Sequence, residues 1–398
     1  MLYRTMPQNG DKLSVLGFGC MRLPMKEGVI DRDRAIAQIR HAIDQGVNYL
    51  DTAWPYHGGE SEPLLGEALK DGYREKVKIA TKLPSWLIKN REDMPRYLDA
   101  QLERLGIECV DYYLVHSLDG SLWDTVDKHG VREFLDTAKA YKRIVNAGFS
   151  FHGLAPDFKR IVDAYDWTFC QIQYNYLDQE FQAGTEGLKY AAAKGLGVVV
   201  MEPLRGGNLA RPTPPPAIAD IWNEADTKRT PAEWALRWVW NHPEVTVVLS
   251  GMNEEEHIAQ NLFMAGQALP GSLTDHELAL VDRVAQKYKE LMKVGCTGCG
   301  YCMPCPAGVE IPKCFDLYNR MHLFDDVQGM QFFYAASLGV VAGEGEPGFA
   351  SRCVACGSCL EKCPQQIPIP EILEHVVADM EGEGFQERLA QVRAMFSK

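Results

Sequence analysis

The chain has 398 residues, of which 46% are hydrophobic and 24% are charged, and its formal net charge is −13. This length allows two or three domains, and the apolar fraction is large enough to fill a substantial core. The acidic balance argues against broad nucleic-acid or anionic-membrane binding, because those partners favour basic surfaces.

The N-terminal residues MLYRTMPQNGDKLSVLG contain no charged and then apolar segment, so we expect no signal peptide. No run of about 18 apolar residues is present, so no membrane span is expected. Nine of the 12 cysteines follow residue 295. A reducing compartment would keep such cysteines available as metal ligands, which favours a cytoplasmic location.

Short apolar runs alternate with helical patterns over the first 290 residues. Residues 2–6 and 12–16 flank a turn-rich tetrapeptide and predict a small hairpin, followed by a barrel strand at 16–21 and a helix at 32–45. Seven further strands are predicted at 47–51, 77–82, 110–116, 147–152, 169–174, 197–202 and 246–250. Strands that alternate with helices indicate parallel βαβ units, and eight of them predict a closed α/β barrel of the (β/α)8 type.

The later segments are predicted to be mostly helical. Residues 205–232 are rich in Gly and Pro and form a long connection after the seventh strand, where loops tend to carry function. Thr274 to Met292 predicts a helix with Thr274 as its cap. Residues 311–350 show helical apolar spacing and contain a glycine-rich turn at 339–348. The amphipathic tail at 369–396 is expected to pack on the barrel or on the domain that it follows.

Four polar side chains lie at successive predicted strand ends, where a parallel barrel gathers its catalytic groups. Asp51 and Tyr56 follow one strand, Lys82 ends the next, and His116 ends the third. Reduction of a carbonyl requires an acid that protonates the developing alkoxide. We therefore predict Tyr56 as the acid, Lys82 as the ammonium that lowers its pKa, Asp51 as the partner of Lys82, and His116 as the group that orients the carbonyl.

Each of these residues also has an ordinary structural explanation. Asp51 could cap a turn, Tyr56 could be an exposed loop aromatic, Lys82 a solvated strand end, and His116 a buried, hydrogen-bonded histidine. All four together, within the patterns LDTAxxY and DYYxxH, resemble the aldo/keto reductase family over about residues 1–290. This resemblance implies an enzyme that reduces a small-molecule aldehyde or ketone with NADPH or NADH.

The resemblance also implies the residues that contact a nicotinamide cofactor. It assigns Ser150 and Gln173 to the carboxamide and Leu204 and Gly206 to the pyrophosphate. It assigns Gly251 and Asn261 to the phosphate and adenine.

The chain departs from the family at three positions. Phe151 replaces an asparagine, Met201 a stacking aromatic, and His257 an arginine. Glu254, Glu255 and Glu256 lie beside His257 and would repel a 2′-phosphate, so the preference for NADPH over NADH stays open. An ordinary helix start rich in acidic residues explains this segment equally well.

Two cysteine runs give the chain its most specific pattern. The first run is Cys-x2-Cys-x2-Cys-x2-Cys-Pro and the second is Cys-x2-Cys-x2-Cys-x3-Cys-Pro, and together they resemble a two-cluster ferredoxin domain. In such domains the fourth cysteine of each run serves the other cluster. The resemblance thus implies two [4Fe-4S] clusters, one on Cys296, Cys299, Cys302 and Cys363 and the other on Cys353, Cys356, Cys359 and Cys305.

Zinc is the alternative metal for paired CxxC motifs. Because the gap before Cys305 is one residue short, its assignment as a ligand has the least support among the eight cysteines. We interpret Cys314, Cys20, Cys109 and Cys170 as buried thiols. The forty-residue helical insert between the runs favours a mostly α-helical ferredoxin-like domain. We therefore predict a barrel domain at residues 1–290 and a 4Fe-4S domain with an amphipathic tail at 291–398.

Two functional hypotheses follow from these two domains. In the first, the barrel is a carbonyl reductase whose clusters couple it to one-electron transfer, with a redox protein as a partner. In the second, the protein carries electrons, and the barrel is a docking scaffold or binds a flavin, although no flavin-binding motif is present. Four aromatic residues are candidates for lining a substrate pocket, with core packing as the alternative for each, namely Trp54, His57, Trp86 and Trp123.

Overall fold

The computed structural model describes residues 1–339 and 346–396. The chain forms two compact units, which we call the barrel unit (Met1–Leu204 and Ala232–Asp275) and the cysteine unit (Arg205–Pro231 and His276–Lys398). This division places the connection after the seventh strand with the cysteines. The boundary expected at residue 290 stays a prediction.

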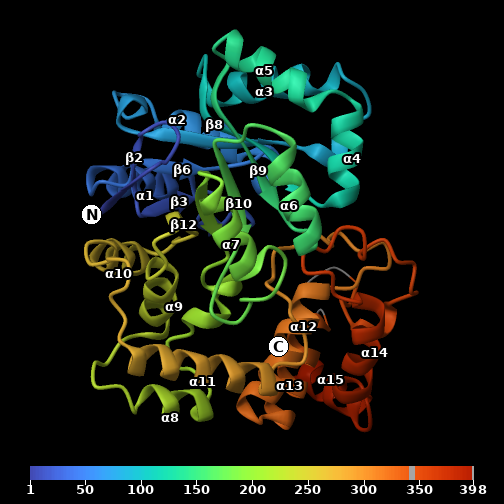
Figure 1. The fold of residues 1–398 in the computed structure, drawn as a ribbon. Helices are drawn as coiled ribbons and strands as arrows, with labels where there is room; N and C mark the ends of the chain where they lie inside the picture. The colour runs from blue at the N-terminus through green and yellow to red at the C-terminus, as the bar shows by residue number, and fades with distance from the viewer. Residues whose placement is uncertain (340–345, 397–398) are drawn as a thin grey trace. The chain divides into compact units, whose positions relative to one another are not determined.

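The barrel unit contains a closed barrel of eight parallel strands in the order β10-β11-β12-β3-β6-β7-β8-β9 (Figure 1). The expected (β/α)8 architecture is thus confirmed, with a mostly helical region after it. The strands are β3 (Leu16–Gly19), β6 (Tyr49–Asp51), β7 (Lys78–Leu83), β8 (Val110–Leu118), β9 (Ile144–Phe151), β10 (Phe169–Gln173), β11 (Gly197–Met201) and β12 (Val245–Ser250).

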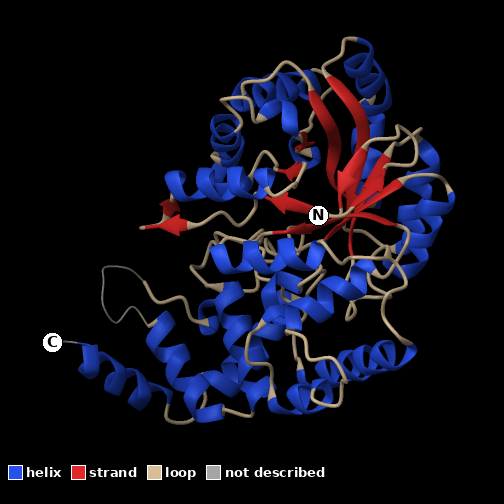
Figure 2. Ribbon diagram, turned by 90° about the vertical axis from the view of Figure 1, so that its left-hand side faces the viewer, coloured by secondary structure: helices blue, strands red, loops and turns tan. Residues whose placement is uncertain are grey.

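Helices surround these strands (Figure 2). They are α1 (Arg32–Asp44), α2 (Ser61–Ala68), α3 (Asp93–Leu105), α4 (Gly120–Lys128), α5 (Val131–Ala140), α6 (Ala155–Ala164), α7 (Gly184–Ala193), α9 (Pro231–Trp240) and α10 (Glu255–Ala265). Local sequence fixes several of the ends. The carboxylate of Asp119 accepts a hydrogen bond from Leu122 N at 2.7 Å and caps α4, and Gly106 ends α3 in the left-handed conformation with φ of 65°.

Two hairpins precede the first helix. The expected one pairs β1 (Tyr3–Thr5) with β2 (Lys12–Ser14). The other pairs β4 (Met25–Lys26) with β5 (Val29–Ile30) and was not predicted.

Alternate residues of the barrel strands point inward, as the two-residue period of a strand requires. Those nearer the amino-terminal end of the barrel form one apolar cluster that includes Tyr49, Tyr112, Phe169, Val199 and Val247. Gly148 makes room for this cluster, because a Cβ there would lie 2.4 Å from the ring of Phe169. The barrel interior is therefore packed up to the level at which its polar residues begin.

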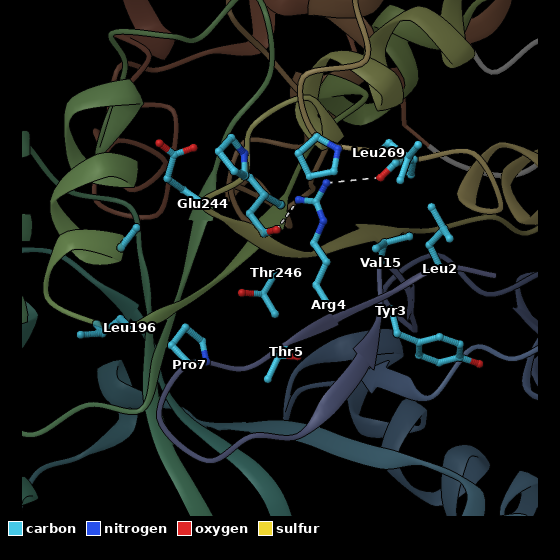
Figure 3. Close-up of a pocket in the computed structure, with 15 residues that line it drawn as sticks. Leu2, Tyr3, Arg4, Thr5, Pro7, Val15, Leu196, Glu244, Thr246 and Leu269 are labelled. Carbon is cyan, nitrogen blue, oxygen red and sulfur yellow. Dashed lines mark hydrogen bonds between the residues drawn. The ribbon is translucent and has the colours of Figure 1, made fainter.

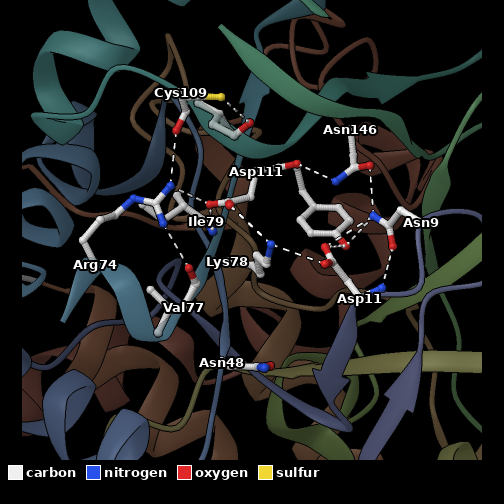
Figure 4. A network of polar contacts seen from close by, with 12 residues as sticks. Asn9, Asp11, Asn48, Arg74, Val77, Lys78, Ile79, Cys109, Asp111 and Asn146 are labelled. Atoms are coloured by element: carbon white, nitrogen blue, oxygen red, sulfur yellow. Dashed lines mark hydrogen bonds and ion pairs between the residues drawn. The ribbon is translucent and has the colours of Figure 1, made fainter. Parts of the chain in front are cut away.

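A hydrogen-bonded polar cluster closes the amino-terminal end of the barrel (Figure 4). Asp111 Oδ2 accepts from Arg74 Nη2 at 2.8 Å and from the backbone N of Ile79 at 2.9 Å. Asn146 donates to the carbonyl of Asp111 at 2.9 Å and accepts from Asn9 at 3.0 Å. These contacts tie β7, β8, β9 and the first hairpin together.

A surface cavity of about 600 Å³ lies at the same end (Figure 3). Arg4 occupies it and donates to the carbonyls of His242 at 2.9 Å, Trp240 at 2.5 Å, and Val245. Its guanidinium is thus used to hold the hairpin against the segment between α9 and β12. The cavity is explained by this structural role.

The cysteine unit is built from helices and irregular loops. Its helices are α8 (Pro216–Trp222), α11 (Asp275–Leu291), α12 (Ile311–Phe324), α13 (Val327–Leu338), α14 (Ile369–Met380) and α15 (Phe385–Phe396). Helix α11 begins one residue after Thr274, as expected for a cap there. Residues of the tail, including Leu373, Val376 and Leu389, share one core with Phe315 and Tyr334, so the tail packs on the domain that it follows.

The glycine-rich turn expected at 339–348 lies largely outside the described residues. Cys314 is buried, as expected, with its Sγ 3.8 Å from the hydroxyl of Tyr334. Cys20 and Cys170 are also buried, whereas Cys109 is only half-buried. Across the described part of the chain, no helix combines the length and the apolar character that crossing a membrane requires.

Candidate active site and cysteine cavity

The structure brings Asp51, Tyr56 and Lys82 together at the carboxyl-terminal end of the barrel. Lys82 Nζ donates to Asp51 Oδ1 at 2.6 Å and to the carbonyl of Thr52 at 2.8 Å, and it lies 3.3 Å from the hydroxyl of Tyr56. Lys82 is 0% exposed and Tyr56 is buried. The alternatives of a solvated lysine and an exposed loop tyrosine are therefore wrong.

His116 lies beside this trio. Its ring centroid is 6.2 Å from that of Tyr56 and 5.1 Å from that of Trp86. Within the described residues, the buried Nδ1 of His116 has no hydrogen-bond partner. The alternative of a hydrogen-bonded core histidine thus fails for this nitrogen, which is available to a ligand.

The electrostatics of Tyr56 differ from the sequence-based expectation. Burial raises the pKa of Tyr56 well above its usual value, the Asp51 carboxylate adds to this rise, and Arg22 opposes it. The expected net lowering of the Tyr56 pKa was wrong for this arrangement, because the loss of water around the phenolate outweighs the attraction of the Lys82 ammonium, which is already paired with Asp51. Tyr56 therefore carries its proton at neutral pH, which is the form that a proton donor needs.

The other two ionisable members are also shifted by burial. Burial raises the pKa of Asp51, and the charge and hydrogen bond of Lys82 oppose the rise. Burial lowers the pKa of His116 well below its usual value, and the charges of Lys82 and His152 lower it further. His116 is thus a neutral imidazole at neutral pH.

A buried polar layer outside the barrel wall holds the strand that carries Lys82. Gln101 Nε2 donates to the carbonyl of Lys82 at 3.0 Å and to Glu62 Oε1 at 2.8 Å. Glu62 also accepts from Thr81 at 2.6 Å and from Arg104 at 3.2 Å. This network fixes the height of Lys82 relative to α2 and α3.

The turn that presents Tyr56 is held by its neighbour. His57 adopts a φ of 53°, in the left-handed region, and its Nε2 accepts from the backbone N of Leu23 at 3.1 Å. His57 thus positions the Tyr56 turn and is not a pocket aromatic.

Three of the expected cofactor residues are buried, Ser150 and Gln173 at the ends of β9 and β10 and Asn261 on α10. Ser150 Oγ accepts from Ser117 N at 2.7 Å, and Gln173 Nε2 donates to Asp178 at 2.9 Å. Asn261 Nδ2 donates to Ser250 Oγ at 2.8 Å. Their roles toward a nicotinamide stay predictions.

Phe151, which stands where the family has an asparagine, points away from the barrel interior. Its ring lies 5.1 Å from that of Phe158 on α6. The next residue, His152, shares the inward face with Ser150 by strand alternation and was missed in the sequence analysis. That alternation, counted two residues onward from Ser150, was the signal that could have found it.

The acidic segment beside His257 is partly neutralised by a residue distant in sequence. Arg34 donates to Glu255 Oε1 at 2.9 Å and to Glu254 Oε2 at 2.5 Å. Gln38 also donates to Glu255 at 2.9 Å. The repulsion expected from three carboxylates is therefore reduced by one guanidinium.

We call Asp51, Tyr56, Lys82 and His116 the tetrad. Of the three tryptophans that were candidates for a pocket, only Trp86 has a ring contact with the tetrad, through His116, and it is 39% exposed. Trp123 is buried against Trp167 at 6.0 Å, and Trp54 stacks under the Arg104 guanidinium at 3.5 Å. Trp123 and Trp54 are thus packing residues.

A cavity in the cysteine unit is lined by Cys296, Cys299, Cys302 and Cys363, together with Phe315 and other apolar residues. Cys363 belongs to the second run, so the structure brings together the first set of four. The second set also comes together. Burial raises the pKa of Cys359, and the nearby thiols of Cys353, Cys305 and Cys356 raise it further. Four convergent thiols fit an iron–sulfur cluster in each case, and the first set also has an apolar lining, whereas Cys356 of the second set is exposed.

The connection after β11 packs on the first cysteine loop within the cysteine unit. Asn208 Nδ2 donates to the carbonyl of Cys296 at 3.3 Å. Gly206 has a φ of 68°, and a Cβ there would lie 1.9 Å from the carbonyl oxygen of Thr297. Only glycine fits this approach, whatever else Gly206 binds. The preceding Leu204 is the last residue of the barrel unit before this loop.

Comparisons with known proteins agree with both units. The model of the "Aldo/keto reductase family" matches residues 15–286, and that of the "4Fe-4S dicluster domain" matches residues 295–367. L-galactose dehydrogenase of Arabidopsis thaliana is 26% identical over 309 residues, which cover 72% of this chain and 95% of the relative. A probable aldo-keto reductase of Glycine max is 27% identical, covering 64% of this chain and 81% of the relative.

Solved structures give the same assignment. The holo form of aldo-keto reductase AKR11C1 from Bacillus halodurans superposes with a TM-score of 0.60 at 25% identity, covering 71% of this chain and 96% of that one. An aldo-keto reductase from Klebsiella pneumoniae in complex with NADPH superposes with a TM-score of 0.57 at 25% identity, covering 72% and 96%. The expected class of oxidoreductase is confirmed, and the chain belongs to the aldo/keto reductase family with a 4Fe-4S dicluster domain after its barrel.

Proposed function

We propose that this protein reduces the carbonyl group of a small aldehyde or ketone with NADPH or NADH. The observation that carries the proposal is the buried trio in which Lys82 Nζ lies 2.6 Å from Asp51 Oδ1 and 3.3 Å from the Tyr56 hydroxyl. A bound nicotinamide supplies the hydride that adds to the carbonyl carbon. Tyr56 gives its proton to the carbonyl oxygen, and the product is the alcohol.

The residues around Tyr56 support this proton transfer. The ammonium of Lys82 stabilises the phenolate that remains after the proton has left, and Asp51 holds the ammonium in place. The unpartnered Nδ1 of His116 is available to hydrogen-bond the carbonyl oxygen and to orient it. Burial keeps water out of this step and strengthens each interaction.

The nicotinamide is proposed to lie against Ser150 and Gln173, with Leu204 and Gly206 at the pyrophosphate and Gly251 and Asn261 at the phosphate and adenine. The Klebsiella relative in complex with NADPH supports a nicotinamide. Arg34 pairs with Glu254 and Glu255 and so reduces the repulsion of a 2′-phosphate, and both NADPH and NADH are therefore proposed.

Two [4Fe-4S] clusters are proposed for the two cysteine sets, and bound clusters supply one-electron transfer to a redox protein partner. Coupling between the nicotinamide and the clusters is part of this proposal, and within the cysteine unit the loop that contains Gly206 packs on the first cysteine loop through Asn208 and Cys296. Clusters of this kind need reduced thiols, so the cytoplasm is the proposed location.

Replacement of Tyr56 by Phe tests the reductase function. We expect kcat/KM for carbonyl reduction to fall about 10²- to 10⁴-fold, because the proton donor is lost. The measurement is aldehyde-dependent oxidation of NADPH and of NADH under anaerobic conditions. Tyr190→Phe is the matched control, because that hydroxyl donates to Asp163 on the surface and its loss should leave activity unchanged.

Unchanged carbonyl reduction in Tyr56→Phe would show that the tetrad is misassigned. If wild-type protein reduces no carbonyl but passes electrons from a chemical reductant through its clusters, the electron-transfer alternative takes the place of this proposal.

Replacement of Cys363 by Ala tests the cluster assignment. Because this thiol completes the first set, the variant should retain about half of the iron and sulfide of the wild type and lose one reduced-cluster signal by EPR. Cys314→Ala is the control, since that buried thiol contacts Tyr334 and lies in neither set. Equal iron content in Cys363→Ala and wild type would contradict the crossed ligand set.

A further inference from the structure

His152 lies next to the tetrad without being one of its four members. Its backbone N donates to the carbonyl of Leu118 at 2.8 Å, so β9 stays paired with β8 to this point, two residues beyond His116. Phe149 and Phe151 pack outward on Phe158, at 5.8 Å and 5.1 Å. The residue that follows Phe151 is therefore directed to the inner face of the barrel mouth.

The imidazole of His152 makes one side-chain hydrogen bond, and its Nδ1 has no hydrogen-bond partner among the described residues. Gln182 hydrogen-bonds the ring. The Nδ1 atom is buried and meets no hydrogen-bond partner in the described part of the chain. Leaving a buried polar atom without a partner costs free energy, so such an atom at a barrel mouth points to a ligand.

The charges that face His152 come from the tetrad. Burial lowers the pKa of His152 to about 4, Gln182 opposes this, and the ammonium of Lys82 lowers it further. His152 in turn lowers the pKa of His116. Two neutral imidazoles thus flank one ammonium, and each presents an unpartnered Nδ1.

We propose that His152 binds a hydroxyl group on the carbon next to the reacting carbonyl, which makes α-hydroxy aldehydes and α-hydroxy ketones the substrate class of this site. The inference rests on the proposed carbonyl reduction. The carbonyl oxygen is held by Tyr56 and His116, and the substituent of the adjacent carbon reaches His152.

The neutrality of His152 selects a hydroxyl over a charged substituent. A neutral imidazole nitrogen pairs with a hydroxyl as a donor or an acceptor, whereas a carboxylate or phosphate is bound better by a cation. A substrate without the hydroxyl leaves Nδ1 unpaired after the site has closed to water. Sites of this kind reject the analogue that lacks the polar group.

Hydroxyacetone and acetone, which differ by one hydroxyl, are the probes for this proposal. We expect wild-type protein to favour hydroxyacetone in kcat/KM by at least about tenfold, and His152→Phe to lose most of this preference, measured as the ratio of the two kcat/KM values. His152→Asn keeps a hydrogen-bonding group and should retain part of the preference. His41→Phe, at an exposed position of α1, is the control and should keep all of it.

The dissociation constants of NADPH and NADH, measured on the same variants, separate this role from binding of the nicotinamide carboxamide. A preference that is unchanged in His152→Phe overturns the proposal. Weaker nicotinamide binding with an unchanged preference overturns it too and assigns His152 to the carboxamide. If wild-type protein reduces neither ketone and no other carbonyl, the proposed reductase function itself fails.

Discussion

The two ends of the barrel carry polar clusters of similar composition that differ in how fully they are hydrogen-bonded. At the amino-terminal end, Asp111, Arg74 and Asn146 contact one another, their neighbours or the backbone through each polar group described above (Figure 4). At the carboxyl-terminal end, Asp51 Oδ2 and the Nδ1 atoms of His116 and His152 have no hydrogen-bond partner within residues 1–339 and 346–396.

This difference separates a structural cluster from a functional one without reference to any relative. A satisfied network stabilises the strands that it joins, whereas unsatisfied buried groups cost free energy that a fold has no structural reason to accept. Both clusters contain a lysine, a carboxylate and a tyrosine hydroxyl, which at the amino-terminal end are Lys78, Asp11 and Tyr112, so composition alone would not distinguish them. The gathering of three unpartnered atoms at one end distinguishes them, since single unpartnered atoms such as Tyr49 Oη and His242 Nε2 also occur elsewhere in the described chain.

The largest effect is expected when the pair Asp51 and Lys82 is replaced by apolar residues. The double variant Asp51→Leu/Lys82→Met should lose at least about 100-fold in kcat/KM, because Tyr56 loses the charge that stabilises its phenolate. Its free energy of unfolding should be equal to or higher than that of the wild type, since replacing a buried ion pair is often neutral or stabilising. The lost hydrogen bond to the carbonyl of Thr52 offsets part of any gain.

The single variant Asp51→Leu is the control for this pair. It leaves the ammonium of Lys82 buried without its carboxylate, which should cost about 3–5 kcal/mol of stability in urea unfolding. A double variant that is less stable than the wild type would mean that the pair stabilises the fold. In that case the two ends of the barrel would not differ in the way we describe.

The barrel could be predicted because each strand is a short apolar run between helical patterns, and strand closure follows from their number. The hairpin β4–β5 was missed because two-residue strands such as Met25–Lys26 carry no periodic signal. Strand β9 begins at Ile144, earlier than the predicted start at residue 147. The prediction began too late because the buried Asn146 after the exposed Val145 interrupts the apolar run.

The candidate site was predictable in its residues and less so in its electrostatics. Lys82 and Tyr56 were found from strand ends, but the direction of the Tyr56 pKa depends on burial, which only the folded arrangement fixes. The pairing of Arg34 with Glu255 joins residues 221 positions apart and has no local signal. His152 was missed because the resemblance to the family marks only Phe151, in place of an asparagine, although strand alternation assigns the inward face to its neighbour.

The smallest effect is expected at the amino-terminal end, where Asp111→Ala should lower stability and leave catalysis intact. The variant removes the acceptor of Arg74 and of Ile79 N, so we expect a loss of about 1–3 kcal/mol in the free energy of unfolding. Urea unfolding and kcat/KM are measured on the same preparation. Asp99→Ala, which removes an exposed carboxylate paired with Arg143, should cost less than about 1 kcal/mol.

A fall in kcat/KM of Asp111→Ala under conditions where the variant is fully folded would contradict the division between the two ends. Asp111 accepts from β7 through Ile79 N, and β7 also carries Lys82, so a distortion of that strand is the route by which the amino-terminal end could reach the site. The contacts of Gln101 with the carbonyl of Lys82 and with Glu62 hold the far end of the same strand. Because this second anchor remains in Asp111→Ala, the height of Lys82 should persist, and stability alone should change.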